Sequence, residues 1–174
     1  MSISINSYSP NLIKRFLKEK KRLSTLLPSF VRIEHVGSSA VGIGGKNIVD
    51  ILIGVPGRKD MEKISKVLTK NGYYEGNDSH DNRIFLASKQ EETGEGDYHI
   101  HICPVNEESF KDFIILREYL RNNPTKANDY FRKKHEFAAE AGFDRKKYKA
   151  LKSTYVSDLL SKAKKKASTW DLLW

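Results

Sequence analysis

The sequence predicts an α+β fold, in which a mixed β-sheet of about five strands has flanking helices and a helical C-terminal part. Two observations carry this prediction. Up to Pro104, short apolar or alternating runs typical of strands are separated by glycine, proline and asparagine. From Ser109 onward the pattern is helical. The chain has 174 residues, so we expect a single domain over residues 1–174, with its core in residues 29–160.

The first helix is predicted over residues 10–27. Leu12, Phe16 and Leu23 fall near one face of such a helix, and Pro28 ends it. These apolar residues should pack on the sheet.

Two strands follow, over residues 30–36, where apolar and polar side chains alternate, and over residues 48–55, which are almost entirely apolar. Residues 37–46, between them, are rich in glycine and are interpreted as an active-site loop with a short helical turn. Asp50 shares one face of the second strand with Leu52 and Gly54, by the period-two rule, and the residues between them should point into the core.

The remaining elements are bounded by Gly72, Pro104, Pro124 and Gly142. They are a helix over residues 59–71, strands over residues 73–75, 82–88 and 98–104 with an exposed connection over residues 90–97, and helices over residues 109–122, 125–141 and 144–166.

The formal net charge of +9 favours an anionic partner, such as a nucleotide, RNA or another polyanion. Basic residues gather in residues 14–22 and 145–166, and both clusters can equally be solvated helix faces. Residues 164–166 read as a frayed polar end without the interleaved aromatic residues that stack bases. Nucleic acid is therefore not the favoured partner.

Cysteine usage and the N-terminus indicate where the protein works. Cys103 is the single cysteine, which excludes an internal disulfide framework and fits a reducing cytosol. The first residues lack the features of a signal peptide, and no apolar run is long enough to span a bilayer. We expect a cytoplasmic protein with no membrane association.

The most informative motif is the Gly37-Ser38 turn, followed twelve residues later by Asp50 in an apolar strand. The backbone N–H groups of such a turn can hold phosphate oxygens, and the carboxylate can hold a divalent cation against them. Polymerase-β-type nucleotidyltransferases combine such a Gly-Ser turn with an acidic residue on the strand that follows. Asp50 could instead only hydrogen-bond the glycine-rich loop.

Several motifs, in order, show that residues from about 29 to about 160 resemble the GrpB family, a branch of the nucleotidyltransferase-like superfamily. They are residues 34–41 (EHVGSSAV), 48–55 (IVDILIGV), 99–102 (HIHI), 116–124 (LREYLRNNP) and 127–134 (ANDYFRKK). The resemblance implies a nucleotidyltransferase-like fold.

Two-metal phosphoryl transfer commonly uses an Asp-x-Asp pair on one strand face, and here Leu52 occupies the second position. The standard two-metal mechanism is therefore in doubt. His99 and His101 share one face of another strand, at the position where superfamily members commonly have a third carboxylate. Together with Asp50 they are the predicted catalytic residues and metal ligands. Imidazole moves the metal preference from Mg²⁺ toward Mn²⁺, Zn²⁺ or Fe²⁺. One histidine could instead act as a general base or contact a phosphate as imidazolium, and both could equally be polar residues lining a cleft.

Phosphate groups need hydrogen-bond donors and cations, for which arginine and lysine are suited. The predicted nucleotide- or phosphate-binding residues are Gly37, Ser38, Ser39, Lys46, Arg83 and Arg117. Arg117 could equally belong to a surface ion-pair cluster.

The function these residues favour is metal-dependent nucleotidyl transfer from an NTP to an unknown acceptor, with Mg²⁺, Mn²⁺ or Zn²⁺ as cofactor. The alternative is a non-catalytic module that binds a nucleotide or another phosphorylated small molecule and lacks the second carboxylate. Whether the protein is an enzyme, and its oligomeric state, stay open in the sequence.

Overall fold

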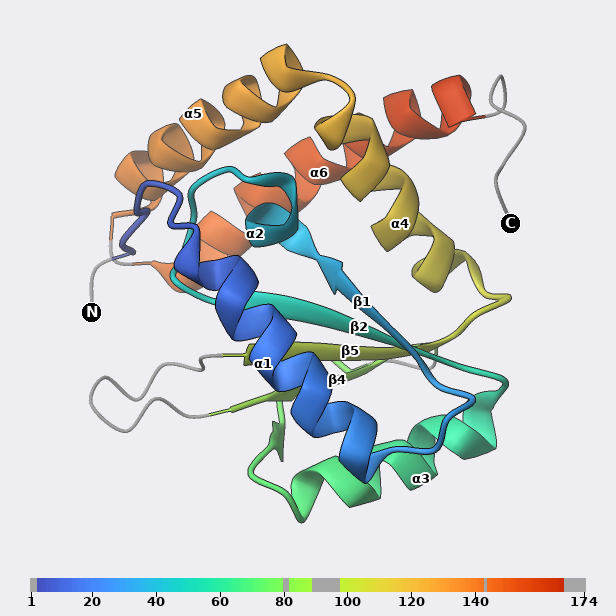
Figure 1. Cartoon of the computed structure of the whole chain (residues 1–174). Helices are drawn as coiled ribbons and strands as arrows, with labels where there is room; N and C mark the ends of the chain where they lie inside the picture. Colours follow the sequence, from blue (N-terminus) through green and yellow to red (C-terminus); the bar gives the residue numbers. More distant parts are fainter. Residues whose placement is uncertain (1–2, 80–81, 89–97, 143, 168–174) are drawn as a thin grey trace.

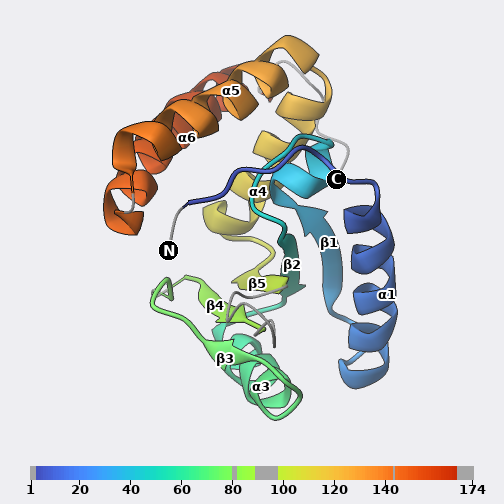
Figure 2. The ribbon, with the colours of Figure 1, turned by 90° about the vertical axis from the view of Figure 1, so that its left-hand side faces the viewer.

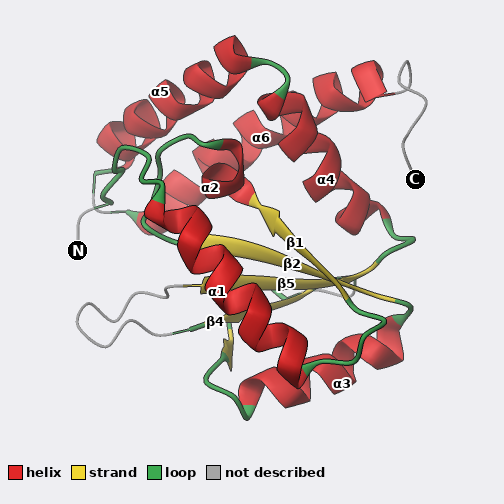
Figure 3. Cartoon of the chain, viewed as in Figure 1, coloured by secondary structure: helices red, strands yellow, loops and turns green. Residues whose placement is uncertain are grey.

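The structure is a computed structural model that describes residues 3–79, 82–88, 98–142 and 144–167. Helices and strands follow the predicted order, which confirms the α+β class (Figures 1 and 3). The helices are α1 (Asn11–Leu26), α2 (Gly37–Val41), α3 (Arg58–Thr69), α4 (Glu108–Arg121), α5 (Pro124–Ala141) and α6 (Arg145–Ala167). The strands are β1 (Arg32–Val36), β2 (Val49–Val55), β3 (Tyr74–Glu75), β4 (Ile84–Ala87) and β5 (Tyr98–Pro104). The predicted connection over residues 90–97 lies outside the described residues.

The five strands form one mixed sheet in the order β1-β2-β5-β4-β3. Strands β2 and β5 are parallel, and the other neighbours are antiparallel. A parallel pair needs a crossover connection, and the segment from α3 through β4 supplies it. The crossover places the polar ends of β2 and β5, which are far apart in the sequence, side by side.

One face of the sheet packs against α1 and α3. Val49, Ile51 and Ile53 of β2 are fully buried there, because a period of two turns all three toward the same side. Leu12 and Phe16 of α1 belong to the same cluster, and their side chains cover this face of the strand, as the helical spacing predicts. This is the larger apolar core.

The opposite face is covered along much of its length by α4, which corrects the expectation that Leu52 and Gly54 point away from the core. Leu52 is 0% exposed and lies in a second apolar cluster with Phe110 and Ile114 of α4. A Cβ atom on Gly54 would lie 2.6 Å from Cε2 of Phe110, so α4 packs directly on the strand. Sequence alternation could not show this second cover, because the helix that supplies it comes more than fifty residues later.

Helices α4, α5 and α6 pack together and form the helical C-terminal part, on the other side of the sheet from α1 (Figure 2). Their shared cluster includes Tyr130 and Leu159. Tyr155 stacks on Tyr130 with ring centroids 5.8 Å apart, so it is a packing residue. The prediction of a frayed polar end is wrong for Lys164, which lies within α6 with its Nζ 2.6 Å from Oδ1 of Asp112. Within the described residues, no helix is long and apolar enough to cross a membrane.

Candidate functional site

Asp50, His99 and His101 lie together on the face that α4 leaves partly open. The register of the parallel pair sets Asp50 of β2 directly beside His99 of β5. Oδ1 of Asp50 is 3.4 Å from Nδ1 of His99 and 3.7 Å from Nε2 of His101. Two histidines at a spacing of two, next to a strand carboxylate, therefore do share one site, as the period-two pattern predicts.

Burial and hydrogen bonding act in opposite directions on Asp50. Burial favours the neutral acid, but the contacts with His101 and His99 favour the carboxylate and hold the pKa of Asp50 well below its usual range. The side chain of His101 is only 10% exposed, and burial lowers its pKa, although Asp50 acts against this. Nδ1 of His101 is buried and has no hydrogen-bond partner in the described part of the chain. The site thus holds an ionised carboxylate next to a buried imidazole.

Gly37 is required at the start of α2 for two reasons. Its φ of +72° lies in the left-handed region, which a residue with a side chain rarely adopts. A Cβ atom there would also lie 2.9 Å from Cγ of Asp50. The glycine turn can therefore approach the carboxylate, and Ser38 is the next residue of the turn.

Lys134 of α5 is the residue of this site that sequence reasoning missed. Its side chain is buried (3% exposed), and its Nζ donates hydrogen bonds to Oγ of Ser38 and, at 2.8 Å, to the carbonyl oxygen of Gly44. The ammonium also lies 4.5 Å from the ring centroid of Tyr130. Burial lowers the pKa of Lys134 to about 7, with repulsion from Lys152 in the same direction and attraction by Asp50 against it. The available signal was the segment 127–134, where Tyr130 and Lys134 are one helical turn apart.

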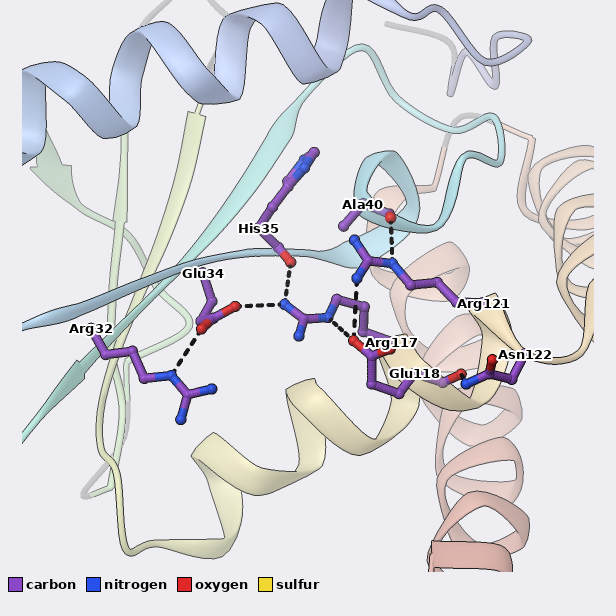
Figure 4. A network of polar contacts seen from close by, with 8 residues as sticks. All are labelled: Arg32, Glu34, His35, Ala40, Arg117, Glu118, Arg121 and Asn122. Carbon is purple, nitrogen blue, oxygen red and sulfur yellow. Dashed lines mark hydrogen bonds and ion pairs between the residues drawn. The ribbon is translucent and has the colours of Figure 1, made fainter. Parts of the chain in front are cut away.

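A network of arginines holds the glycine turn from behind (Figure 4). Arg117 of α4 donates to Oε2 of Glu34 at 2.8 Å and to the carbonyl oxygen of His35 at 2.9 Å. Arg121 donates to the carbonyl oxygen of Ala40 at 3.0 Å, so both ends of α2 are held by one helix. The structure thus engages Arg117 within the protein, in the ion-pair cluster that was its alternative interpretation, rather than beside Asp50.

The other predicted phosphate-binding residues divide between two places. Ser39 is buried and lies 2.9 Å from Nε2 of His35, behind the turn rather than in it. Arg83 forms an ion pair with Asp78 at 3.5 Å and does not reach the turn. Lys46 lies on the loop before β2 and borders the same pocket as His99, with its Nζ 5.3 Å from the ring centroid of Tyr148.

The next question is whether the residues around Asp50 can bind a divalent metal ion. Among the described residues, no group of three or more His, Cys, Asp and Glu side chains could hold a metal ion. Asp50 is flanked by imidazoles at ion-pair distance, and a second carboxylate at Leu52 is replaced by a fully buried apolar side chain. The described residues therefore do not form a complete ligand set for a divalent ion, and we derive no chemical step through one.

The sheet, the Gly-Ser turn after its first strand and the acidic residue on its second define a protein of the nucleotidyltransferase-like fold. A structure of Cid1 in complex with its short product ApU has a similar fold, with a TM-score of 0.50 and 15% identity. That similarity covers 78% of this chain and 43% of the Cid1 chain.

Within this class the chain belongs to the GrpB family, because the family model for GrpB protein matches residues 2–162. The glutamate-rich protein GrpB of Alkalihalophilus pseudofirmus is 30% identical over 89% of this chain and 92% of its own length. A UPF0157 protein of Pseudomonas aeruginosa is 32% identical over 83% of this chain, which spans 60% of that relative. The crystal structure of GrpB from Enterococcus faecalis matches with a TM-score of 0.82 and 24% identity, over 94% of this chain and 99% of that one. The family and the fold implied by the sequence motifs are both confirmed.

Proposed function

We propose that this protein binds a nucleotide or another phosphorylated small molecule, with a phosphate group held by the Gly37-Ser38 turn and Lys134. The observation that carries this proposal is the buried ammonium group of Lys134. Its contacts in the described part of the chain are two neutral oxygens and one aromatic ring, with no carboxylate paired to it. A buried ammonium group with no carboxylate at ion-pair distance is costly, and burial lowers its pKa although Asp50 attracts it from farther away. A phosphate group would bring a negative charge into direct contact with it.

The surroundings of Lys134 favour phosphate over a simple carboxylate ligand. The hydroxyl group of Ser38 and the backbone N–H groups of the glycine turn offer several donors at one place, which suits an anion with several oxygens. Lys46, at the pocket that borders His99, offers a second cation for a further phosphate group. The phosphate set we propose is therefore Gly37, Ser38, Lys46 and Lys134, without Ser39, Arg83 and Arg117.

Calorimetric binding of inorganic triphosphate and ATP tests this assignment. Lys134→Met keeps a side chain of similar length and removes the charge, so the affinity for both ligands should fall at least tenfold, the loss expected for a charge-assisted hydrogen bond. The matched control is Lys133→Met, because Lys133 is the neighbouring lysine, pairs with Glu136 and lies on the outside of α5. Equal losses in the two variants would show that overall charge, rather than this site, binds the anion.

A second candidate function is nucleotidyl transfer from an NTP to an acceptor, and the position of Asp50 against Gly37 favours it. Such a reaction is expected to depend on a divalent ion, for which the described residues do not form a complete ligand set. Release of pyrophosphate from NTPs, assayed with Mg²⁺, Mn²⁺ or Zn²⁺, separates the two functions. Release that is lost in Asp50→Asn supports a transferase, whereas tight NTP binding without release supports a binding module.

A further inference from the structure

One row of residues crosses the sheet through the candidate site. The strand register sets Asp50 beside His99, His99 beside Ala87, and Ala87 beside Tyr74. Directly paired residues share a face of the sheet, so all four side chains project to the side on which Asp50 lies. The row therefore continues the site away from the glycine turn, toward the edge strand β3.

The row contains a gap in side-chain volume at Ala87. Neighbouring strands are about 4.8 Å apart, so the backbones of His99 and Tyr74, two strands apart, are separated by roughly 10 Å. In this row the residue between His99 and Tyr74 is Ala87, whose side chain is a methyl group, 4% exposed, and the ring of Phe85 contacts His99 from beside the row. A flat ring in contact with both neighbours at about 3.5–4 Å needs roughly 7–8 Å between them. Strand spacing of this size leaves room for about one ring between the two side chains.

A pocket of about 380 Å³ lies at this place, and its lining includes His99, Ala87 and Tyr74. Phe85, two residues before Ala87, also lines it, and its ring meets that of His99 edge-on with centroids 5.0 Å apart. Gly76 follows β3, and a Cβ atom there would lie 2.6 Å from Phe85 Cδ1, so the chain passes close over that ring. Tyr74, on the edge strand, is 39% exposed and lies at the outer side of the row.

We propose that this pocket binds a planar heteroaromatic ring, stacked between His99 and Tyr74 over Ala87. This inference rests on the phosphate site proposed above and extends it, because the same row joins the pocket to Asp50. Lys46, Arg145 and Glu75 also line the pocket, so two of its three charged side chains are positive, which favours a ligand that carries phosphate. Two sources could supply the ring: the base of the bound nucleotide, or an aromatic acceptor beside it. Stacking tolerates every base, because each has a π-face.

The test compares ATP, adenosine and inorganic triphosphate by calorimetry in the wild type, Tyr74→Ala and Tyr74→Phe. If the ring belongs to the nucleotide, Tyr74→Ala should weaken ATP roughly 5- to 150-fold, the range for loss of one stacking contact. Triphosphate should be unaffected, and Tyr74→Phe should stay close to the wild type, since it keeps the ring. If the ring belongs to an acceptor, ATP affinity should hold while adenosine, measured with saturating triphosphate, loses affinity.

Two further variants make the result decisive. Phe30→Ala removes another exposed aromatic ring, 55% exposed, that is not among the residues lining the pocket and should change none of the affinities. Ala87→Leu should block ATP or adenosine by filling the pocket, and retained triphosphate binding would show that this variant is folded. Unchanged affinities of both ATP and adenosine in Tyr74→Ala overturn the ring pocket. Failure of triphosphate to bind the wild type instead refutes the phosphate site.

Discussion

The two faces of strand β2 meet very different surroundings. On one face, Ile51 and Ile53 pack against α1 and α3 in the larger apolar core. On the other face, Asp50 is surrounded by imidazoles and a glycine turn, while Leu52, two residues further along, is as fully buried as Ile51. The polar character of the second face is therefore local. It is confined to the end of the strand near Gly37, and the rest of that face is a second core.

The comparison also shows which helices create the difference. Helix α4 both buries Leu52 and, through Arg117 and Arg121, holds the glycine turn. Helix α5 follows it and brings Lys134 to Ser38. The C-terminal helices that close the second core thus also complete the candidate site, whereas α1 and α3 contribute packing on the far side of the sheet.

The largest expected effect comes from placing charge in the second core. Leu52→Asp would restore the two-carboxylate pattern, but it buries an unpaired carboxylate among Phe110, Ile114 and Val36, which are apolar. We expect a loss of roughly 3–5 kcal/mol in the free energy of unfolding, measured by urea denaturation. Leu52→Met, which conserves volume, should cost less than about 1.5 kcal/mol. Near-wild-type stability of Leu52→Asp would show that water reaches this face of the sheet at Leu52.

A smaller loss is expected at the polar end of the same strand. Asp50→Asn keeps the size of the side chain but removes the charge that His99 and His101 hold, so we expect a cost of about 1–3 kcal/mol at pH 7. The pKa of Asp50 is lowered in the folded protein, so its contribution is present above the ordinary pKa and is lost as the pH falls below about 4. Denaturation of both proteins at pH 7, 5 and 3.5 should show the stability difference beginning to narrow only at the lowest pH.

Removing the charge of Lys134 should stabilise the folded protein at pH 7, whereas removing that of Asp50 destabilises it, because burial disfavours the charged form of Lys134. Its pKa falls from the ordinary value of 10.5 to about 7, so between these values the unfolded chain binds more protons than the folded one. Wild-type stability should therefore rise with pH in that window, by up to about 1.4 kcal/mol per pH unit from this group. Lys134→Met lacks this dependence and should be more stable than the wild type at pH 7, by a margin that shrinks toward pH 9.

The control for this pH effect is Lys133→Met, whose stability difference from the wild type should not vary over the same range. A constant difference between the wild type and Lys134→Met from pH 7 to 9 would contradict a buried ammonium group at this position.

The smallest effect is expected at the end of α6. Replacing Lys164, Lys165 and Lys166 with glutamine removes the ion pair of Lys164 with Asp112, which should cost less than about 1 kcal/mol. Ligand affinity at physiological salt should not change, because exposed charges farther than a Debye length of about 8 Å are screened. A loss of ATP binding in this triple variant would place the ligand on the helical surface instead of at the glycine turn.

The sequence by itself determined the elements and half of the site. Apolar and alternating runs located the central strands, and glycine and proline located the turns. The period of two also put His99 and His101 on one face of their strand. All of these features depend only on residues close together in the sequence. The turn at Gly37 could also be predicted, because glycine adopts a positive φ readily and so marks a tight turn after a strand.

Only the tertiary structure decided what lies above that face. Whether Leu52 is open or buried, whether Arg117 meets phosphate or Glu34, and whether Lys134 is a surface lysine or the cation at Ser38 all depend on where α4 and α5 dock. Docking depends on the fit of whole apolar surfaces, which periodicity along one strand or helix does not encode. The pattern of residues alone therefore could not predict the long-range contact between Lys134 and Ser38.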